Sequence, residues 1–137
     1  MAKIRHIAIF TDDPVALGEF YVETFGMEKR GETRTPKGGH AVWLTDGYLE
    51  LAIILPEDRD APRGVNHFGF TLEPGERDAV YGKLAARGIA PWQPPREGRP
   101  YIEDAIRDPA GNKLDVSTGL RPEIARTPKA KETAGAK

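Results

Sequence analysis

The feature of this chain that most restricts its fold is an internal repeat. Four strand-like stretches and one helix-like stretch follow one another in the order β-α-β-β-β in the first half, and the same order returns in the second half. The strand-like stretches are 3–10, 27–33, 39–45 and 48–55 in the first half, and 65–72, about 90–93, 101–107 and 113–118 in the second. Because one such unit cannot cover its own sheet, the two copies are expected to pack together.

Local signals mark where the elements begin and end. In the first half, Asp13 followed by proline suits the N-cap and the first helical position, and Gly26 is a natural stop after apolar residues at helical spacing. The second helix is predicted over 74–88. The dipeptide Asp46-Gly47 between two apolar runs is typical of a hairpin turn.

Composition limits the classes of function. The chain contains 20 Lys and Arg against 21 Asp and Glu, so it has no excess positive charge with which to bind nucleic acid or an anionic membrane surface. Cysteine is absent, which excludes disulfides, thiolate metal sites and cysteine nucleophiles. No apolar run is long enough to span a bilayer, and the N-terminus has no apolar leader region, so a cytoplasmic protein is expected.

The repeat predicts one domain over 1–118, with modules at about 3–55 and 65–118 that are joined by a polar linker. The remaining residues, 119–137, are rich in Ala, Lys, Thr and Pro and contain almost no large apolar side chains. Such a segment cannot bury enough surface to offset its ordering entropy, so it is expected to be a mobile C-terminal tail.

Side chains alternate between the two faces of a strand, so the repeat also predicts which residues share a face. In the first strand of each module a histidine, His6 or His67, lies on the face opposite the better-filled apolar row, with Ile4 placed on the same face as His6. In the last strand of each module an acid, Glu50 or Asp115, lies opposite an apolar row. Two histidines and two carboxylates are therefore expected to point into one space.

A single histidine or carboxylate on a strand is usually structural or solvated. The matched positions in both halves favour instead one shared metal site made by His6, Glu50, His67 and Asp115. Imidazole and carboxylate ligands without thiolate suit divalent Fe, Mn, Co, Ni or Zn. Four ligands leave two octahedral positions for water or substrate. If one acid does not bind, two histidines and one carboxylate remain, with open positions.

At these residues the chain resembles the vicinal oxygen chelate superfamily, which includes glyoxalase I, methylmalonyl-CoA epimerase, extradiol dioxygenases, fosfomycin-resistance enzymes and bleomycin-resistance proteins. The resemblance covers about residues 3–118. It rests on the runs IRHIAIFTDDP, FYVETFGM, DGYLELAII, GVNHFGF and DPAGNKLDV. The resemblance implies a glyoxalase-like α+β fold, in which two βαβββ modules form a curved mixed sheet around one cavity.

The resemblance also implies a role for each ligand position. His6 corresponds to the first-strand histidine of the family, Glu50 to the fourth-strand glutamate of glyoxalase I, and His67 to the fifth-strand histidine. Asp115 stands where most relatives have glutamate. The shorter aspartate binds the metal directly, binds it through water, or leaves the metal more open, and the sequence does not decide among these.

Three classes of function follow from the resemblance. In the first, a glyoxalase-like lyase, isomerase or epimerase, the metal holds vicinal oxygens of a small substrate while a carboxylate moves a proton; Glu50 is the first candidate for this base and Asp115 the second. In the second, an extradiol dioxygenase, His6, His67 and Asp115 hold Fe(II), but a chain with one pair of modules is shorter than usual. The third, a bleomycin-resistance-like binding protein, is disfavoured because such proteins lack the metal ligands.

Further residues are candidates for the wall of a substrate pocket. They are His40, Tyr48, Trp92, Tyr101, Glu103 and Arg107. Trp43 is a candidate too, although packing in the core is its more frequent role. The expected partners are a small-molecule substrate and a second copy of the chain in a homodimer. The resemblance leaves open whether the site lies within one chain or takes one module from each of two chains.

Overall fold

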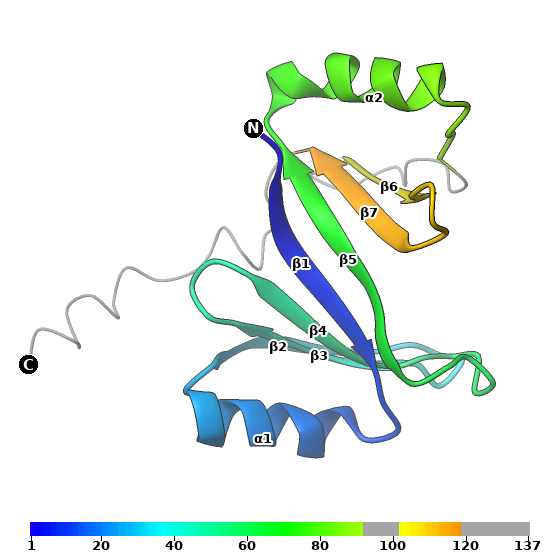
Figure 1. Cartoon of the computed structure of the whole chain (residues 1–137). Coiled ribbons are helices and arrows are strands. Elements are labelled where there is room, and N and C mark those ends of the chain that lie inside the picture. Colours follow the sequence, from blue (N-terminus) through cyan, green and yellow to red (C-terminus); the bar gives the residue numbers. More distant parts are fainter. Residues whose placement is uncertain (92–101, 119–137) are drawn as a thin grey trace, which may run out of the picture.

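The computed structural model describes residues 1–91 and 102–118. All seven described strands form one mixed sheet in the order β2-β3-β4-β1-β5-β7-β6 (Figure 1). The elements are β1 (Lys3–Phe10), α1 (Pro14–Phe25), β2 (Glu28–Arg34), β3 (His40–Thr45), β4 (Glu50–Leu55), β5 (Gly64–Leu72), a 3-10 turn (Pro74–Glu76), α2 (Arg77–Ala86), β6 (Ile102–Arg107) and β7 (Lys113–Thr118). This arrangement confirms the predicted α+β class.

The internal repeat is visible in the strand pairing. In each module the first strand pairs in parallel with the last, β1 with β4 and β5 with β7. The two modules meet where β1 and β5 run antiparallel at the centre of the sheet. The first strands of both modules therefore lie side by side, which brings residues about 60 positions apart in sequence into contact.

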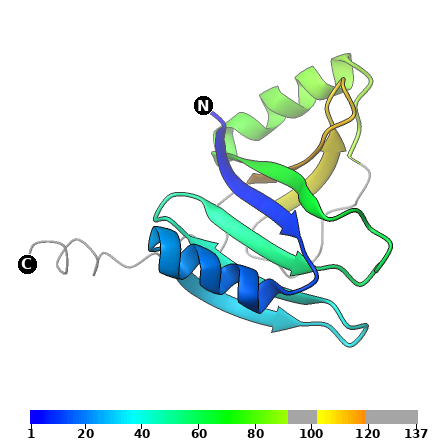
Figure 2. The same cartoon turned by 60° about the horizontal axis from the view of Figure 1, so that its bottom comes forward.

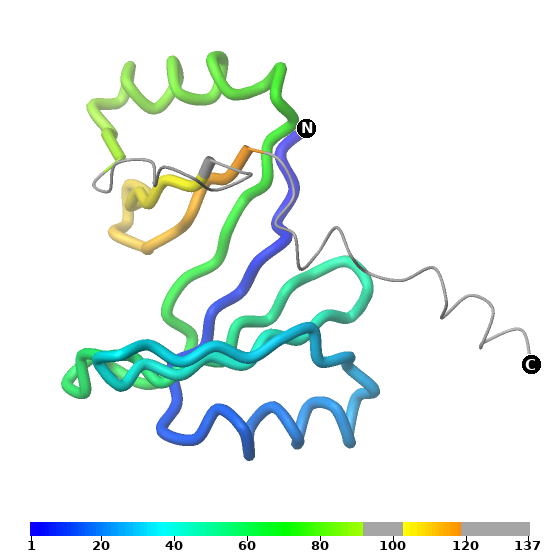
Figure 3. The backbone as a smooth tube through the Cα atoms, turned by 180° about the vertical axis from the view of Figure 1, so that it is seen from behind, coloured from blue at the N-terminus to red at the C-terminus, as the bar shows by residue number. Residues whose placement is uncertain are grey.

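The two helices cover the same face of this twisted sheet, one in each module. Figures 2 and 3 show α1 lying along β2, β3 and β4, and α2 lying along β5, β6 and β7. Under α1 the core contains Val42, Leu44 and Ile53, and under α2 it contains Leu72, Ile106, Leu114 and Val116. The other face of the sheet, opposite the helices, is called the site face below.

The predicted boundaries of the first helix are confirmed. Oδ1 of Asp13 accepts a hydrogen bond from the backbone N–H of Ala16 at 3.0 Å, as an N-cap should. Gly26 ends the helix in the left-handed conformation, at φ 73°. In the second module, the predicted helix over 74–88 begins instead with the 3-10 turn, and α2 itself spans Arg77–Ala86.

One expected strand is absent from the part of its range that the structure describes. The sequence predicts a strand at about 90–93, but Ala90 and Pro91 lie outside any strand. The rest of that stretch, with Trp92, lies outside the described residues, as do Tyr101 and the predicted tail 119–137. Among the residues that the structure describes, no helix combines the length and the apolar character that crossing a bilayer requires.

Candidate metal centre

The strand register lines up a row of side chains across the site face. Opposite one another in this row lie Thr45, Glu50, His6, Gly69, Asp115 and Ala105. His67 lies in the neighbouring row, opposite Ala8. The antiparallel junction of β1 and β5 places the histidine of one module directly beside that of the other. All four predicted ligands thus share one face of one chain.

The expected alternation holds through most of β1 but fails at its start. Ile4 lies opposite Phe70, on the helix side, whereas His6 lies opposite Gly69 on the site face. Arg5 is an extra residue in β1 at this point, so two neighbours that alternation places together lie on different faces. The prediction that Ile4 shares the face of His6 is therefore wrong.

Three of the four residues bring their donor atoms together. Nε2 of His6 lies 3.2 Å from Nε2 of His67, and Oδ2 of Asp115 lies 3.1 Å from the His67 nitrogen and 3.8 Å from the His6 nitrogen. His6 is 6% exposed and Asp115 9% exposed, so the group is shielded from bulk water. Three atoms that could bind a metal ion therefore lie within 4.8 Å of one another on the site face, and their residues, His6, His67 and Asp115, are called the metal group below.

Neighbouring residues fix the orientation of both imidazole rings. Nδ1 of His6 lies 3.0 Å from Oε1 of Glu50, and Nδ1 of His67 lies 2.7 Å from Oδ1 of Asn66. Both oxygens can accept hydrogen bonds, which favours the tautomer with its proton on Nδ1 in each ring. A neutral imidazole has one ring proton, so both Nε2 atoms then carry lone pairs. Two lone pairs and a carboxylate oxygen therefore face one another.

This donor set fits a divalent cation. Two atoms that bind the same ion in neighbouring positions, at ordinary metal–ligand lengths, are roughly 3.0–3.4 Å apart. Two of the three observed separations match this value, and the third is a few tenths of an ångström longer. A metal ligand histidine usually donates its other ring nitrogen to a carboxylate or carbonyl oxygen, as His6 and His67 do here.

Glu50 takes a position behind this group. Its carboxylate is 1% exposed and contacts Nδ1 of His6, on the side of the ring away from His67. It is not among the three residues whose donor atoms gather. In this geometry Glu50 orients His6, and the role of fourth ligand requires its carboxylate to turn toward the group.

Gly69 leaves the space that the group occupies. A Cβ atom added at Gly69 would lie 3.2 Å from Cβ of His6, 3.3 Å from its Cδ2, and 3.5 Å from Cβ of Asp115. The first two distances are shorter than most real contacts of this kind, so a side chain here would displace His6. The small residue beside the histidine is therefore part of the geometry of the site.

The remaining predicted pocket residues divide between the two faces. Ala105 lies opposite Asp115 on the site face. Glu103 and Arg107 are two positions before and after Ala105 in β6, so their side chains are on the same face. Tyr48 precedes β4 and is 46% exposed, and the guanidinium of Arg5 stacks 4.2 Å from the centre of its ring. Trp92 and Tyr101 lie outside the described residues.

His40 is not brought to the metal group. In β3 it lies opposite Leu55 of β4, and its side chain is on the same face as the residues packed under α1. Its Nε2 lies 2.7 Å from Oε2 of Glu32. Hydrogen bonds from Lys29 and His40 lower the pKa of Glu32 to about 2. The strand parity of His40, which matches that of Val42, could have predicted this position on the helix side.

Sequence reasoning missed Asn66. Alternation places its side chain on the face opposite that of His67. The register of β1 and β5 shifts at this point, because Ala8 lies opposite His67 while Ile9 lies opposite Val65. The extra residue on β5 is Asn66, and the shift lets its side chain reach Nδ1 of His67. No signal in the sequence marks such a bulge.

Comparisons with known proteins agree with this fold. The family model described as Glyoxalase/Bleomycin resistance protein/Dioxygenase superfamily matches residues 3–116. No curated protein matches the chain. A hypothetical protein from Bacillus halodurans C-125 has a similar structure, with a TM-score of 0.69 and 16% identity over 88% of this chain and 96% of that one.

Two methylmalonyl-CoA epimerases are also similar in structure. The enzyme from Streptomyces coelicolor, in complex with 2-nitronate-propionyl-CoA, has a TM-score of 0.67 and 22% identity, over 88% of this chain and 99% of that one. The enzyme from Mycobacterium tuberculosis has a TM-score of 0.68 and 17% identity, over 89% and 90% of the two chains. Identities this low show a shared fold. Because the family model covers most of its length, the chain belongs to the Glyoxalase/Bleomycin resistance protein/Dioxygenase superfamily, the vicinal oxygen chelate family that its motifs resemble.

Proposed function

We propose that this protein is a metal-dependent enzyme of the lyase, isomerase or epimerase type, which moves a proton on a small substrate held through vicinal oxygens. The observation that carries the proposal is the set of three acceptor atoms, from His6, His67 and Asp115, that face one another on the site face. Membership of the superfamily, and the fold shared with methylmalonyl-CoA epimerases, support the same class of reaction.

His6, His67 and Asp115 are the proposed metal ligands. A divalent Fe, Mn, Co, Ni or Zn ion bound there would supply a Lewis acid for the oxygens of the substrate. The hydrogen bonds from His6 to Glu50 and from His67 to Asn66 keep both Nε2 atoms directed at one point. Direct binding by Asp115 is favoured over binding through water, because its Oδ2 already lies 3.1 Å from Nε2 of His67.

Glu50 is the proposed general base, with Asp115 second. Its carboxylate lies on the site face in the same row as His6, 3.0 Å from Nδ1 of that ring. On leaving Nδ1 of His6 it can bind the metal as a fourth ligand or accept a proton from the substrate. Tyr48, Glu103 and Arg107 are the proposed substrate contacts among the described residues, and a homodimer in the cytoplasm remains part of the proposal.

An extradiol-type Fe(II) dioxygenase is the second candidate. One observation favours it: without Glu50, the group is two histidines and one carboxylate, which is the ligand set of many non-haem Fe(II) oxygenases. The two candidates differ in their need for dioxygen. Proton transfer proceeds without oxygen, whereas ring cleavage consumes it.

Substitution of the proposed base tests the first candidate. In D2O, wild-type protein loaded with Co²⁺ or Ni²⁺ is expected to introduce deuterium into methylmalonyl-CoA or into the hemithioacetal of methylglyoxal, measured by mass spectrometry. Glu50→Gln should lower this rate by about 10²–10⁴-fold at saturating metal, because the amide cannot accept the proton. Glu23→Gln, at an exposed position on α1, is the matched control and should exchange at the wild-type rate.

Metal content measured in the same samples separates a lost base from a lost ligand. Exchange that continues unchanged in Glu50→Gln would rule out Glu50 as the base. If the wild-type protein exchanges neither probe but the Fe(II) form consumes oxygen in the presence of catechol, the second candidate replaces the first.

A further inference from the structure

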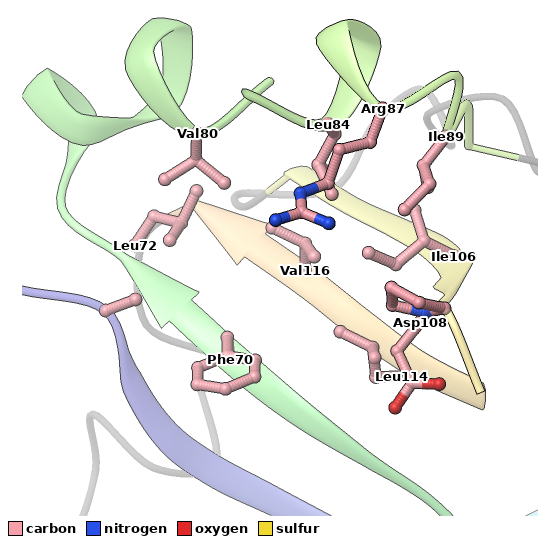
Figure 4. Close-up of a pocket in the computed structure, with 12 residues that line it drawn as sticks. Phe70, Leu72, Val80, Leu84, Arg87, Ile89, Ile106, Asp108, Leu114 and Val116 are labelled. Atoms are coloured by element: carbon pink, nitrogen blue, oxygen red, sulfur yellow. The ribbon is translucent and has the colours of Figure 1, made fainter. Parts of the chain in front are cut away.

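One feature that the proposed activity does not use is a cavity between α2 and the sheet. Its volume is about 470 Å³, which lies within the range of pockets that bury small molecules. Figure 4 shows aliphatic side chains from α2 above and from β5, β6 and β7 below. Leu114 and Val116 point into it, whereas Asp115 between them belongs to the site face. The cavity and the metal group therefore lie on opposite sides of β7.

The first module provides an internal comparison. There, Gly18 and Pro14 of α1 are buried, and a Cβ added at Gly18 would lie only 3.2 Å from Cγ1 of Val42, so helix and sheet are in close contact. In the second module no residue of α2 is buried, and its Val80, Tyr81 and Leu84 are only partly buried where they pack against the core. The helix is thus more deeply packed on the sheet in the first copy of the βαβββ unit than in the second.

A hydrogen-bonded group attaches α2 to β6. Asp104 on β6 is 2% exposed, and its Oδ2 accepts hydrogen bonds from the hydroxyl of Tyr81 and from Nη2 of Arg77, both on α2. The guanidinium of Arg77 also stacks 4.3 Å from the centre of the Tyr81 ring. A buried carboxylate is costly without such partners, so the helix cannot move without losing them. These polar contacts therefore help to fix the position of α2 over the sheet.

The rim of the cavity carries two charged groups with different surroundings. The carboxylate of Asp108 accepts hydrogen bonds from the backbone N–H groups of Ala110 and Asn112 and from the side chain of Asn112, so the turn at 108–112 satisfies it. The guanidinium of Arg87 makes no hydrogen bond or ion pair with any residue in 1–91 or 102–118. Figure 4 shows its guanidinium directed over the aliphatic wall.

We propose that this cavity binds an amphipathic monoanion, with a hydrocarbon chain between α2 and the sheet and a carboxylate at the guanidinium of Arg87. Aliphatic walls favour a hydrocarbon guest, because burial removes apolar surface of both partners from water. A guanidinium that has no side-chain partner among the described residues matches a carboxylate in charge and in geometry. The carboxylate of Asp108 repels the carboxylate of the ligand. The head group of the ligand is therefore placed on the Arg87 side of the rim.

Titration of the full-length protein with decanoate tests this assignment. Calorimetry should give saturable binding of one decanoate per chain, and amide NMR signals of residues such as Leu84 and Val116 should shift. Neutral 1-decanol should bind about tenfold or more weakly than decanoate, since a hydrogen-bonded charge pair is lost. Because the site face is separate, EDTA should leave the affinity for decanoate unchanged.

Variants locate the ligand. Arg87→Gln should weaken decanoate about tenfold and leave 1-decanol unaffected, whereas Arg34→Gln, at an exposed arginine on β2, should change neither. Leu84→Trp and Val80→Trp each fill the cavity and should weaken both ligands at least tenfold, so either folded variant is sufficient. Absence of saturable decanoate binding, binding that survives in a folded tryptophan variant, or equal affinity for decanoate and 1-decanol would each overturn the proposal.

Discussion

The candidate metal site depends on which ring nitrogen carries the proton in His6 and in His67. Glu50 and Asn66 each hold the Nδ1 proton of one histidine, and this leaves both Nε2 atoms as acceptors beside Oδ2 of Asp115. Three acceptors with no donor between them repel one another, so a bound cation would stabilise this arrangement. The two partners outside the group are as important to this argument as the three residues within it.

Gly69→Ala tests how closely this group is packed. The new methyl group would lie 3.2 Å from Cβ of His6, so the ring should move and the affinity for Co²⁺ or Zn²⁺ should fall about tenfold or more in a competition titration. Gly82→Ala on α2 is the matched control, since its methyl group meets nothing within 4 Å. The control should bind metal like wild type and gain about 0.5–1 kcal/mol of stability. Metal affinity unchanged in Gly69→Ala would contradict this account of the site.

Alternation along the strands was sufficient to predict that His6, Glu50, His67 and Asp115 share a face. It could not predict the contact of Asn66 with His67 or the position of Ile4, because both depend on bulges in the pairing of β1 with β5. A bulge arises from the fit of two strands to each other. Neither strand contains a local signal for it.

At the scale of elements, α2 differs from α1 in how it is attached. Its attachment includes a buried polar group, in which Tyr81 and Arg77 donate to Oδ2 of Asp104. Among the described residues, Oδ1 of Asp104 has no hydrogen-bond partner. A carboxylate in such surroundings depends strongly on each of its remaining hydrogen bonds.

Tyr81→Phe removes one of these hydrogen bonds. The free energy of unfolding should fall by about 1–3 kcal/mol, because the buried Asp104 loses a donor. Tyr21→Phe in α1 is the control, since Tyr21 makes ring contacts with Phe20 and Phe25 and should lose little on removal of its hydroxyl. Denaturant unfolding at neutral pH measures both variants. Equal stability of the two variants would contradict the proposed role of Asp104.

Alkaline pH gives a second test of the same contact. Burial, followed by the hydrogen bond to Asp104, raises the pKa of Tyr81 above its ordinary value of 10.0. In the unfolded chain this tyrosine ionises near pH 10, while in the folded chain it stays neutral, so its contribution to stability is present below that pH and is lost as the pH rises further. Wild type should therefore lose stability above pH 10 more steeply than Tyr81→Phe.

The sequence predicted the two helices with unequal success. Asp13 and Gly26 marked the ends of α1 correctly, because both signals act within one turn of the backbone. The start of α2 was placed early, since Pro74 suits a 3-10 turn as well as a first helical position. Asp104 could not be recognised as a buried group, because its partners come from a helix more than 20 residues earlier.

At the scale of the whole molecule, the repeat contained most of the information about the fold. Each βαβββ unit exposes one sheet face and one histidine. Two such units predict one continuous sheet and one site to which both units contribute residues. The strand order, with β1 and β5 antiparallel at the centre, was not predictable, because the same units can also join across two chains. In this structure the metal group is completed within a single chain.

The central claim is that His6, His67 and Asp115 bind a divalent metal, and metal analysis combined with thermal unfolding tests it most directly. Wild type should contain one transition-metal ion per chain, and EDTA should lower its Tm by several degrees, because metal at 100-fold its Kd stabilises by about 2.7 kcal/mol. His67→Ala should lose both properties. His40→Gln, the third histidine of the chain, should keep both, since its ring contacts Glu32. A wild-type protein that contains no metal after growth and purification without chelator, and whose Tm does not change with EDTA or added Co²⁺, would contradict the account.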